Sequence, residues 1–425
     1  MSAINSKETK IQHGQRPLIE SIENIIEKSN SNTIKIAFVS PYPPSKGTLN
    51  EYAFHLIEQM KAKKEIEEII VITDKLPNGQ SYPEMEEESK ITIKDAWSFN
   101  SYQTSLNIRK AILDCKADVV FYNIQFLSFG DKKIQATLGL MAPLMSKISG
   151  VPSVVMLHNI TETVDYESAG ITSNPLLKKF YNFSGTILTK LLLSADLVTV
   201  TIPKYVKILE EKYKVKNVAL VPHGSFEVIP MPDLNTWTAR KQVMTFGKFG
   251  TYKKVEEMIE AVDLVRQRTN EPIDIVIAGT DNPNVKGYLE DVKDQYRHIE
   301  DIYFTGYVEE EDVPTIFSDS TIVVFPYTST TGSSGVLHQA GSYAKAVVLP
   351  NIGDLKELIE DEGYEGEYFE PSDVESLAKA IERLIVDKDR RDLLATKNYA
   401  ASSSLPMSDI VDWFLFHFNG LIKKD

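Results

Sequence analysis

Short apolar runs rich in β-branched residues alternate with longer amphipathic stretches along most of the chain. The first such unit has an apolar run at 34–40, a loop with Pro and Gly at 41–47 and an amphipathic helix pattern at 48–61. Further strands are expected at 68–73, 118–122, 152–157, 196–201 and 217–221, with helices at 101–115, 132–149, 174–194 and 204–212. Strands that alternate with helices predict a parallel, doubly wound sheet.

The alternation stops at a polar, Pro-containing stretch, 224–240, whose composition is typical of an interdomain connection. Beyond it, strands are expected at 242–247, 273–278, 302–305, 322–325 and 346–349, with helices at 255–269, 285–296, 313–318 and 336–345. The 425 residues are too many for one hydrophobic core. We therefore predict an α/β protein with two Rossmann-like doubly wound domains that face each other across a cleft.

The expected organisation has five parts. They are an N-terminal arm (1–33), a first domain (34–223), a linker (224–240), a second domain (241–404) and a C-terminal helix (405–425). In that helix five residues recur at helical spacing and form one apolar face: Ile410, Val411, Phe414, Leu415 and Phe418. Such a face requires a partner surface, which is a domain of this chain or another subunit.

Composition and charge narrow the classes of function. The formal net charge of −14 argues against nucleic acid as the main ligand, since phosphate backbones are bound by clustered Lys and Arg. Cys115 is the only cysteine, which excludes an internal disulfide and fits a reducing compartment, so a cytoplasmic location is expected. The longest apolar stretch, 186–200, is interrupted by Lys190 and Asp196. We expect at most peripheral contact with a membrane.

Two loops of the second domain have the residues of a phosphate site. The loop before the helix at 336–345 offers glycines for close backbone approach, hydroxyl groups and the free amides of a helix N-terminus. Its residues are Thr331, Gly332, Ser333, Ser334, Gly335 and Val336. The segment 246–254 brings Gly247, Lys248 and Lys253 to the same edge of the sheet. An ordinary helix cap and a solvated lysine pair are the alternatives, but together the loops favour a nucleoside diphosphate held without a metal ion.

With these motifs the chain resembles the GT-B type glycosyltransferases, specifically the retaining family-4 group. Gly247, Lys248 and Lys253 fall on the family's Gly-Arg-x-x-x-x-Lys-Gly motif, with Lys in place of Arg. Gly279 matches a second landmark glycine, and Tyr307 lies in the Gly-aromatic turn that the family holds beside the nucleotide base. The resemblance also implies that the first domain (34–223) is the acceptor side, that the second (241–404) is the nucleotide-sugar donor side, and that the C-terminal helix crosses back to the first domain.

The chain departs from the family at two positions. The family has two glutamates here, the first at the donor sugar and the second at the ribose, but this sequence has Thr331 and Gln339. Their hydroxyl and amide groups can still form hydrogen bonds. In the first domain, Gly47 corresponds to the family's glycine loop, although Lys46 replaces its paired glycine, and His158 resembles the histidine held near the transferred sugar.

The resemblance implies a metal-independent glycosyltransferase that moves a sugar, with retention, from a nucleotide diphosphate sugar to an unidentified acceptor. That acceptor is a sugar, a lipid-linked glycan or a small molecule, and the nucleotide sugar is the only co-substrate expected. His158, Lys248 and Lys253 are the candidate catalytic residues, although a satisfied structural histidine remains open for His158. His223 is expected to pack at the hinge at least as readily as it binds a ligand. A GT-B fold sugar-nucleotide epimerase and a non-catalytic nucleotide-sugar binding protein remain as alternatives.

Overall fold

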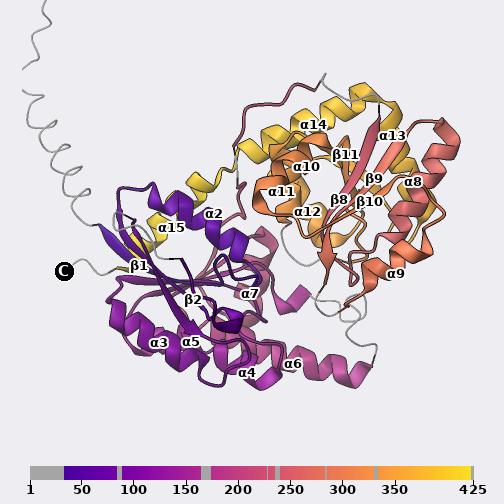
Figure 1. The fold of residues 1–425 in the computed structure, drawn as a ribbon. Helices are drawn as coiled ribbons and strands as arrows, with labels where there is room; N and C mark the ends of the chain where they lie inside the picture. The colour runs from indigo at the N-terminus through magenta and orange to yellow at the C-terminus, as the bar shows by residue number, and fades with distance from the viewer. Residues whose placement is uncertain are drawn as a thin grey trace, which may run out of the picture.

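The structure, a computed structural model, describes residues 33–83, 89–163, 174–226, 228–234, 240–282, 285–329 and 334–422. These residues form two α/β domains, each built on one parallel sheet (Figure 1). The prediction of two doubly wound domains is confirmed.

The first domain contains a seven-stranded sheet in the order β3-β2-β1-β4-β5-β6-β7. Every neighbouring pair in it is parallel. The strands are β1 (Ile34–Val39), β2 (Ile66–Asp74), β3 (Ile91–Trp97), β4 (Val119–Ile124), β5 (Ser153–Leu157), β6 (Leu197–Val200) and β7 (Val218–Leu220). The central strands are buried along almost their whole length, because helices cover both faces of the sheet.

The helices of this domain divide between the two faces of the sheet (Figure 1). They are α2 (Asn50–Lys61), α3 (Thr104–Cys115), α4 (Lys133–Gly139), α5 (Ala142–Ile148), α6 (Pro175–Leu192) and α7 (Pro203–Tyr213). Residues of α3, α5, α6 and α7 share one buried cluster with Val120 and Val155, and Leu140, directly after α4, also belongs to it. On the other face, α2 packs with Phe38 and Phe121.

The second domain contains a six-stranded parallel sheet in the order β10-β9-β8-β11-β12-β13. Its strands are β8 (Lys241–Phe249), β9 (Ile273–Asp281), β10 (Ile302–Gly306), β11 (Ile322–Val324), β12 (Ala346–Pro350) and β13 (Gly366–Phe369). Its helices are α8 (Glu256–Thr269), α9 (Tyr288–Gln295), α10 (Val313–Asp319), α11 (Gly335–Ser342), α12 (Gly353–Glu362), α13 (Val374–Val386) and α14 (Lys388–Ser403). One core includes α8, α9 and α13, and the opposite core includes α10, α11 and α12.

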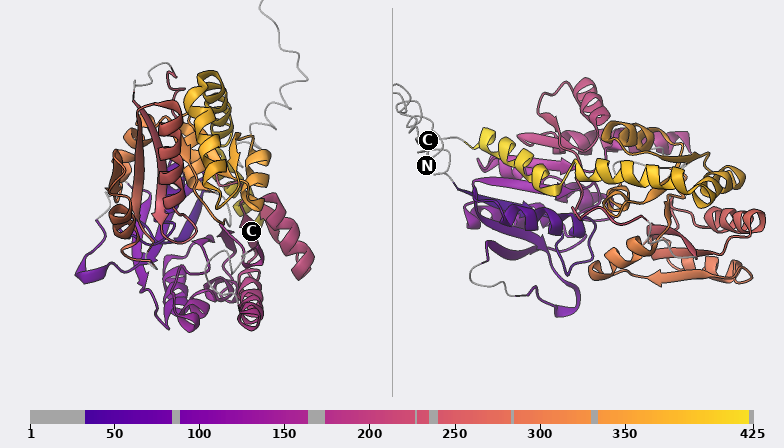
Figure 2. Two further views of the ribbon diagram at one scale, coloured as in Figure 1. Left: turned by 90° about the vertical axis from the view of Figure 1, so that its right-hand side faces the viewer. Right: turned by 90° about the horizontal axis from the view of Figure 1, so that it is seen from above.

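The last helix, α15 (Met407–Leu421), leaves the second domain and packs on the first, as Figures 1 and 2 show. Its apolar face joins the cluster on the α2 side of the first sheet. The ring of Phe414 lies 4.7 Å from that of Phe121 on β4. The partner of this amphipathic face is therefore the first domain of the same chain.

Three local features differ from the sequence-based expectations. β3 was not predicted, because it is an edge strand whose residues are mostly half-buried or exposed, so it lacks the apolar run of a central strand. β13 was missed because it has only four residues and begins with a glycine. The helix expected at 132–149 is divided into α4 and α5, since Gly139 ends the first and Pro143 opens the second. Among the described residues, no helix has the length and apolarity needed to span a membrane.

Candidate active site

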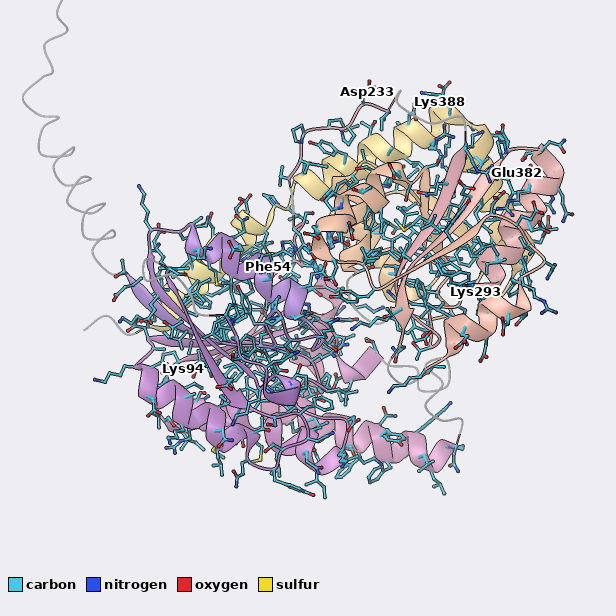
Figure 3. The ribbon with its side chains drawn as sticks, in the orientation of Figure 1. Phe54, Lys94, Asp233, Lys293, Glu382 and Lys388 are labelled. Carbon is cyan, nitrogen blue, oxygen red and sulfur yellow. The ribbon has the colours of Figure 1, made fainter. Side chains whose placement is uncertain are left out.

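The carboxyl ends of the two sheets meet where the domains face each other, which is where doubly wound sheets bind ligands. Side chains of the two domains extend into the region between them (Figure 3). Three interdomain contacts mark this region: Glu51 with Gln339, His55 with Glu310, and Lys46 with Tyr307.

Gly247 and Gly279 lie at the ends of adjacent strands and permit a very close backbone approach. Their φ angles are 141° and 136°, a region that favours glycine. A Cβ atom on Gly279 would lie only 1.9 Å from the Gly247 carbonyl oxygen. A Cβ atom on Gly247 would lie 2.7 Å from Nζ of Lys253. These two predicted positions are therefore next to each other. Gly279 has no room for a side chain, and a side chain at Gly247 would displace the ammonium group of Lys253.

Lys248 and Lys253 bring two positive charges to this edge. The ammonium group of Lys253 lies 4.7 Å from the centre of the Tyr327 ring, and the two residues are also paired through their backbones. Burial lowers the pKa of Lys248, the charge of Lys253 lowers it further, and Glu51 acts in the opposite direction. The loop therefore holds two cations close enough to affect each other, an arrangement that favours an anionic ligand.

Part of the predicted phosphate loop can be placed. Thr331, Gly332 and Ser333 lie outside the described residues. Ser334 is the residue before α11, and Gly335 and Val336 form its first turn. The backbone amides of a first turn have no acceptor within the helix. A Cβ atom on Gly335 would lie 3.5 Å from the ring of His223, so this turn borders the domain junction.

Sequence reasoning missed Glu51, which is in the first turn of α2 in the first domain. The amide nitrogen of Gln339 donates a hydrogen bond of 3.3 Å to the Glu51 carboxylate across the domain interface. Burial raises the pKa of Glu51 and Glu310 raises it further, while His55, Gln339 and Lys248 lower it. Thr331 and Gln339 replace the two glutamates of the resembling family. The first domain nevertheless brings a carboxylate, that of Glu51, into contact with Gln339. The signal in the sequence was Glu51 and His55 at i,i+4, on one face of the helix that follows the Gly47 loop.

His158 is buried at the end of β5 and is held by its neighbours. Its Nε2 donates to the Asn123 side-chain oxygen at 2.7 Å, since the Asn123 amide nitrogen is directed at Ser40. Burial, with a contribution from His223, lowers the pKa of His158 to about 3. The ring is therefore neutral near pH 7, and Nδ1 has the acceptor lone pair. It can accept a hydrogen bond from a hydroxyl group but cannot supply a proton as an imidazolium ion.

Gly47 and Tyr307 lie on opposite sides of the cleft opening. The Gly47 amide donates to the Ser45 hydroxyl at 3.2 Å, which tightens the loop after β1. Lys46, the residue before Gly47, extends across the domain interface, and its ammonium group lies 4.3 Å from the centre of the Tyr307 ring. The lysine that replaces a glycine of the resembling family thus contacts the residue expected beside the nucleotide base.

Beside Gln339 the domains leave a cavity of only about 10 Å³, lined by residues such as Phe226, Glu310 and Tyr343. This volume suits one water molecule, whereas ligand pockets usually measure a few hundred Å³. A nucleotide sugar would therefore not fit into this cavity beside Gln339 at its present size.

Glu51, His55 and Glu310 also offer three ligand atoms that lie within 4.8 Å of one another. His55 and Glu310 already contact each other at 2.9 Å. Carboxylate and imidazole groups are common ligands of divalent cations, so this trio is the place to look if a metal affects activity.

The two facing domains and the site between them define the GT-B fold. Within this fold, residues 240–387 match the family described as Glycosyl transferases group 1. A stretch of 148 residues is 26% identical to an uncharacterised glycosyltransferase of Methanocaldococcus jannaschii and covers 35% of this chain. The chain spans about a third (36%) of the length of that relative.

Solved structures show the same fold over almost the whole chain. Sucrose-phosphate synthase from Thermosynechococcus elongatus has a TM-score of 0.67 at 15% identity, and the match covers 91% of this chain and 99% of that one. HepE from Anabaena, in complex with UDP and glucose, has a TM-score of 0.63 at 14% identity, covering 91% and 100%. A UDP-forming trehalose-phosphate synthase from Burkholderia xenovorans has a TM-score of 0.65 at 13% identity, covering 92% and 100%.

Proposed function

We propose that this protein is a glycosyltransferase that moves a sugar from a nucleoside diphosphate sugar to an acceptor hydroxyl group. The observation that carries the proposal is the pair Lys248 and Lys253 at a glycine-lined edge of the second sheet. Lys253 lies over the Tyr327 ring, and Tyr327 is hydrogen-bonded to Ser334 at the start of α11. The match of this domain to group 1 glycosyl transferases supports it. UDP is the first nucleotide to test, since solved structures of similar fold include a complex with UDP and glucose.

The proposed reaction proceeds with retention and without a metal ion. The bond from the sugar carbon to the diphosphate oxygen breaks, and the acceptor oxygen bonds to the same face of that carbon. The acceptor proton passes to the departing phosphate oxygen. Lys248 and Lys253 then stabilise the negative charge that develops on the diphosphate, while the neutral His158 accepts a hydrogen bond from a sugar hydroxyl.

The lysine pair provides the test of donor binding. We expect Lys253→Ala, and to a smaller degree Lys248→Ala, to weaken UDP binding by about 1–3 kcal/mol each, as for other charge-assisted contacts. Isothermal titration calorimetry measures this directly. Lys254→Ala is the matched control, because the ammonium group of Lys254 lies 5.0 Å from the centre of the Tyr288 ring. Unchanged affinity in both single variants and in the double variant would contradict the diphosphate assignment.

Transfer itself is tested by product analysis with and without an acceptor. A new glycoside formed only with the acceptor, with the anomeric configuration of the donor by NMR, supports a retaining transferase. A changed donor sugar without an acceptor indicates an epimerase instead. Binding of the donor with neither outcome, across a panel of acceptors, indicates a binding protein.

Metal independence is tested by chelation. If the two lysines neutralise the diphosphate, EDTA should leave the transfer rate nearly unchanged. Complete loss of activity, restored by Mn²⁺ or Mg²⁺, would contradict this prediction. A restoration that fails in His55→Ala would then place the ion at Glu51, His55 and Glu310, whose ligand atoms are within 4.8 Å of one another.

A further inference from the structure

Helix α6 has an exposed apolar stripe. Leu176, Phe180, Phe183 and Ile187 are 76%, 51%, 65% and 44% exposed. Their spacing of four, three and four residues places them on one side of the helix. The opposite side is the one that packs on the domain, since Gly185, Thr189 and Leu192 are buried. A surface helix of a water-soluble protein normally presents polar side chains on its outer side, so this stripe requires an explanation.

Lysines accompany the apolar stripe. Lys179 and Lys190 are exposed, and their helical positions fall on the same side as Phe183. The helix also contains Lys178, and its 18 residues contain no acidic residue. The outer side of α6 is therefore both apolar and positively charged.

The neighbouring helices extend this surface. The ammonium group of Lys133 on α4 lies 5.4 Å from the centre of the Phe180 ring, and the adjacent Ile134 is 64% exposed. Figure 1 shows α3, α4, α5 and α6 along one side of the first domain. Exposed apolar side chains continue there on α3 and α5, at Leu106, Leu113 and Ile148. The face formed by these four helices is called the α3–α6 face below.

The charge of this face is opposite to that of the whole chain. The four helices contain seven Lys or Arg residues and one Asp, which gives a net charge of +6. The whole chain has a net charge of −14. An anionic partner would attract this face and repel most of the remaining surface, so electrostatics alone would orient the protein.

Two kinds of macromolecular partner fit a basic and apolar surface to different degrees. A second copy of the chain, joined through the same face, would place lysines opposite lysines, because a twofold interface brings each patch against itself. A lipid surface has no such conflict. Its phosphate headgroups accept the ammonium groups, while aromatic and aliphatic side chains enter the boundary between headgroups and acyl chains.

We propose that the α3–α6 face docks on an anionic lipid bilayer, with the α6 stripe inserted at the headgroup level and Lys179 and Lys190 on lipid phosphates. The proposal does not depend on sugar transfer, because no nucleotide-binding residue takes part. A bilayer-bound first domain would, however, hold the cleft at a fixed distance from acceptors in that membrane.

Vesicle flotation tests the proposal with the full chain and without nucleotide. The probes are vesicles of phosphatidylcholine alone and vesicles in which about a third of the lipid is phosphatidylglycerol. We expect binding to the anionic vesicles, much weaker binding to the neutral ones, and loss of binding at high salt. The double variants Phe180→Ser/Phe183→Ser and Lys179→Glu/Lys190→Glu should each lower the bound fraction about tenfold.

Matched controls come from exposed residues of the second domain. Leu393→Ser and Lys379→Glu alter side chains that are 49% and 61% exposed on α14 and α13, and both should leave vesicle binding unchanged. Circular dichroism and thermal melting identify any variant that fails to fold. Equal binding of the wild type to both vesicle types, or no binding to the anionic vesicles, overturns the proposal. A wild-type dimer that becomes monomeric in Phe180→Ser/Phe183→Ser also overturns it, since the face would then be a subunit contact.

Discussion

The two domains contact each other in two regions, which are built differently. One is the opening of the cleft, and the other is the junction, where the chain passes between the domains at the linker after His223 and at the segment that leads into α15. At the opening, exposed or half-buried side chains make the contacts: Lys46 lies over Tyr307, and His55 pairs with Glu310. Contacts of this kind usually contribute about 0–1 kcal/mol each, because water competes for the same groups.

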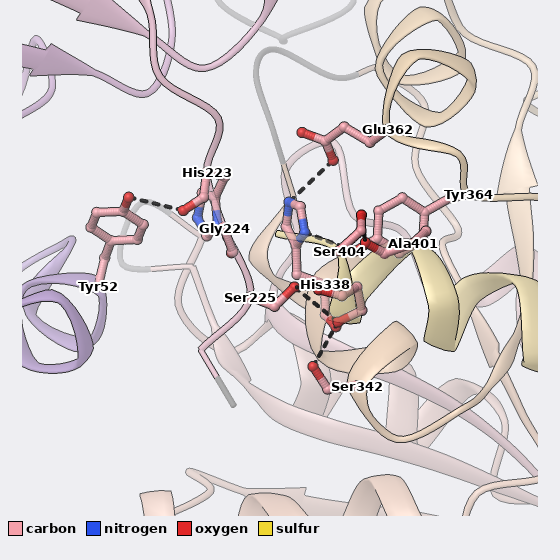
Figure 4. A network of polar contacts seen from close by, with 11 residues as sticks. Tyr52, His223, Gly224, Ser225, His338, Ser342, Glu362, Tyr364, Ala401 and Ser404 are labelled. Atoms are coloured by element: carbon pink, nitrogen blue, oxygen red, sulfur yellow. Dashed lines mark hydrogen bonds and ion pairs between the residues drawn. The ribbon is translucent and has the colours of Figure 1, made fainter. Parts of the chain in front are cut away.

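At the junction, the contacts are buried and include the backbone. The Ser225 amide donates to the Leu405 carbonyl and the Met407 amide donates to the Ser225 carbonyl, so the linker and the segment that leads into α15 lie side by side. Ser402 joins Ser225 and Ser342 through hydroxyl hydrogen bonds of 2.8 Å. Ser225 and Ser342 are labelled in this network in Figure 4. The rings of His223 and His338 stack with their centres 4.9 Å apart.

The difference shows where the domains can move. Weak contacts at the opening can be exchanged for contacts with a ligand, whereas loss of a buried hydrogen-bonded network costs far more. We therefore expect the junction to act as the hinge and the opening to separate when a substrate enters. The predictions below disturb these two regions, in order of decreasing effect.

Removal of α15 should have the largest effect. Truncation after Ser404 removes Ile410, Phe414 and Phe418 from the core of the first domain. Burial of each such side chain contributes about 1.5–3 kcal/mol, and domains are stable by only about 5–15 kcal/mol, so we expect the first domain to lose its fold. Soluble yield, circular dichroism and thermal melting measure this loss.

A matched pair of point variants separates the loss of buried packing by α15 from the mere shortening of the chain. Phe414 is buried and Phe416, on the same helix, is 74% exposed. Phe414→Ala should lower the free energy of unfolding by about 3–5 kcal/mol, and Phe416→Ala by less than about 0.5 kcal/mol. A truncated protein that stays compact in small-angle scattering and transfers sugar normally would show that α15 is dispensable at the junction.

Glu362 should make the junction sensitive to pH. Its carboxyl group lies 3.5 Å from Nε2 of His338, and burial, with a contribution from Asp361, raises its pKa to about 8. Burial also lowers the pKa of His338 well below its ordinary value, so the pair is neutral near pH 7. In the unfolded chain Glu362 loses its proton near its ordinary pKa of 4.5. The folded state therefore binds more protons between pH 4.5 and 8, and stability should fall as the pH rises through this window.

The variant Glu362→Gln should remove this dependence. We expect it to be about 1–3 kcal/mol more stable than the wild type at pH 8 and nearly equal at pH 4.5. Thermal melts across this range measure the difference. Glu360→Gln, at an exposed position of α12, is the control. A variant that is less stable than the wild type at pH 8 would mean that Glu362 is ionised in the folded protein.

Features within one domain could be predicted from the sequence, whereas contacts between the two domains could not. The two sheets and the apolar face of α15 follow from local periodicity, and the glycine positions Gly247 and Gly279 follow from strand ends next to helix starts. The partner of Glu51 could not be predicted, because an acidic residue in the first turn of a helix usually only complements the helix dipole. Its contact with Gln339, like the stacking of His223 on His338, exists only after the domains come together.

The smallest effect is expected at the opening, from Lys46→Ala. The variant removes the contact with Tyr307, and exposed cation–π contacts contribute about 0.5–1 kcal/mol, so the folded state should be hardly affected. The closed arrangement should become less favourable by a similar amount, which would raise the KM for the donor about two- to fivefold. Lys75→Ala, after β2, is a control of equal charge.

Since Tyr307 supplies the other half of the contact, Tyr307→Leu should have the same effect, and the double variant should add little to either change. Additive losses in the double variant would show that Lys46 and Tyr307 act on the donor separately, and that their contact does not hold the cleft closed.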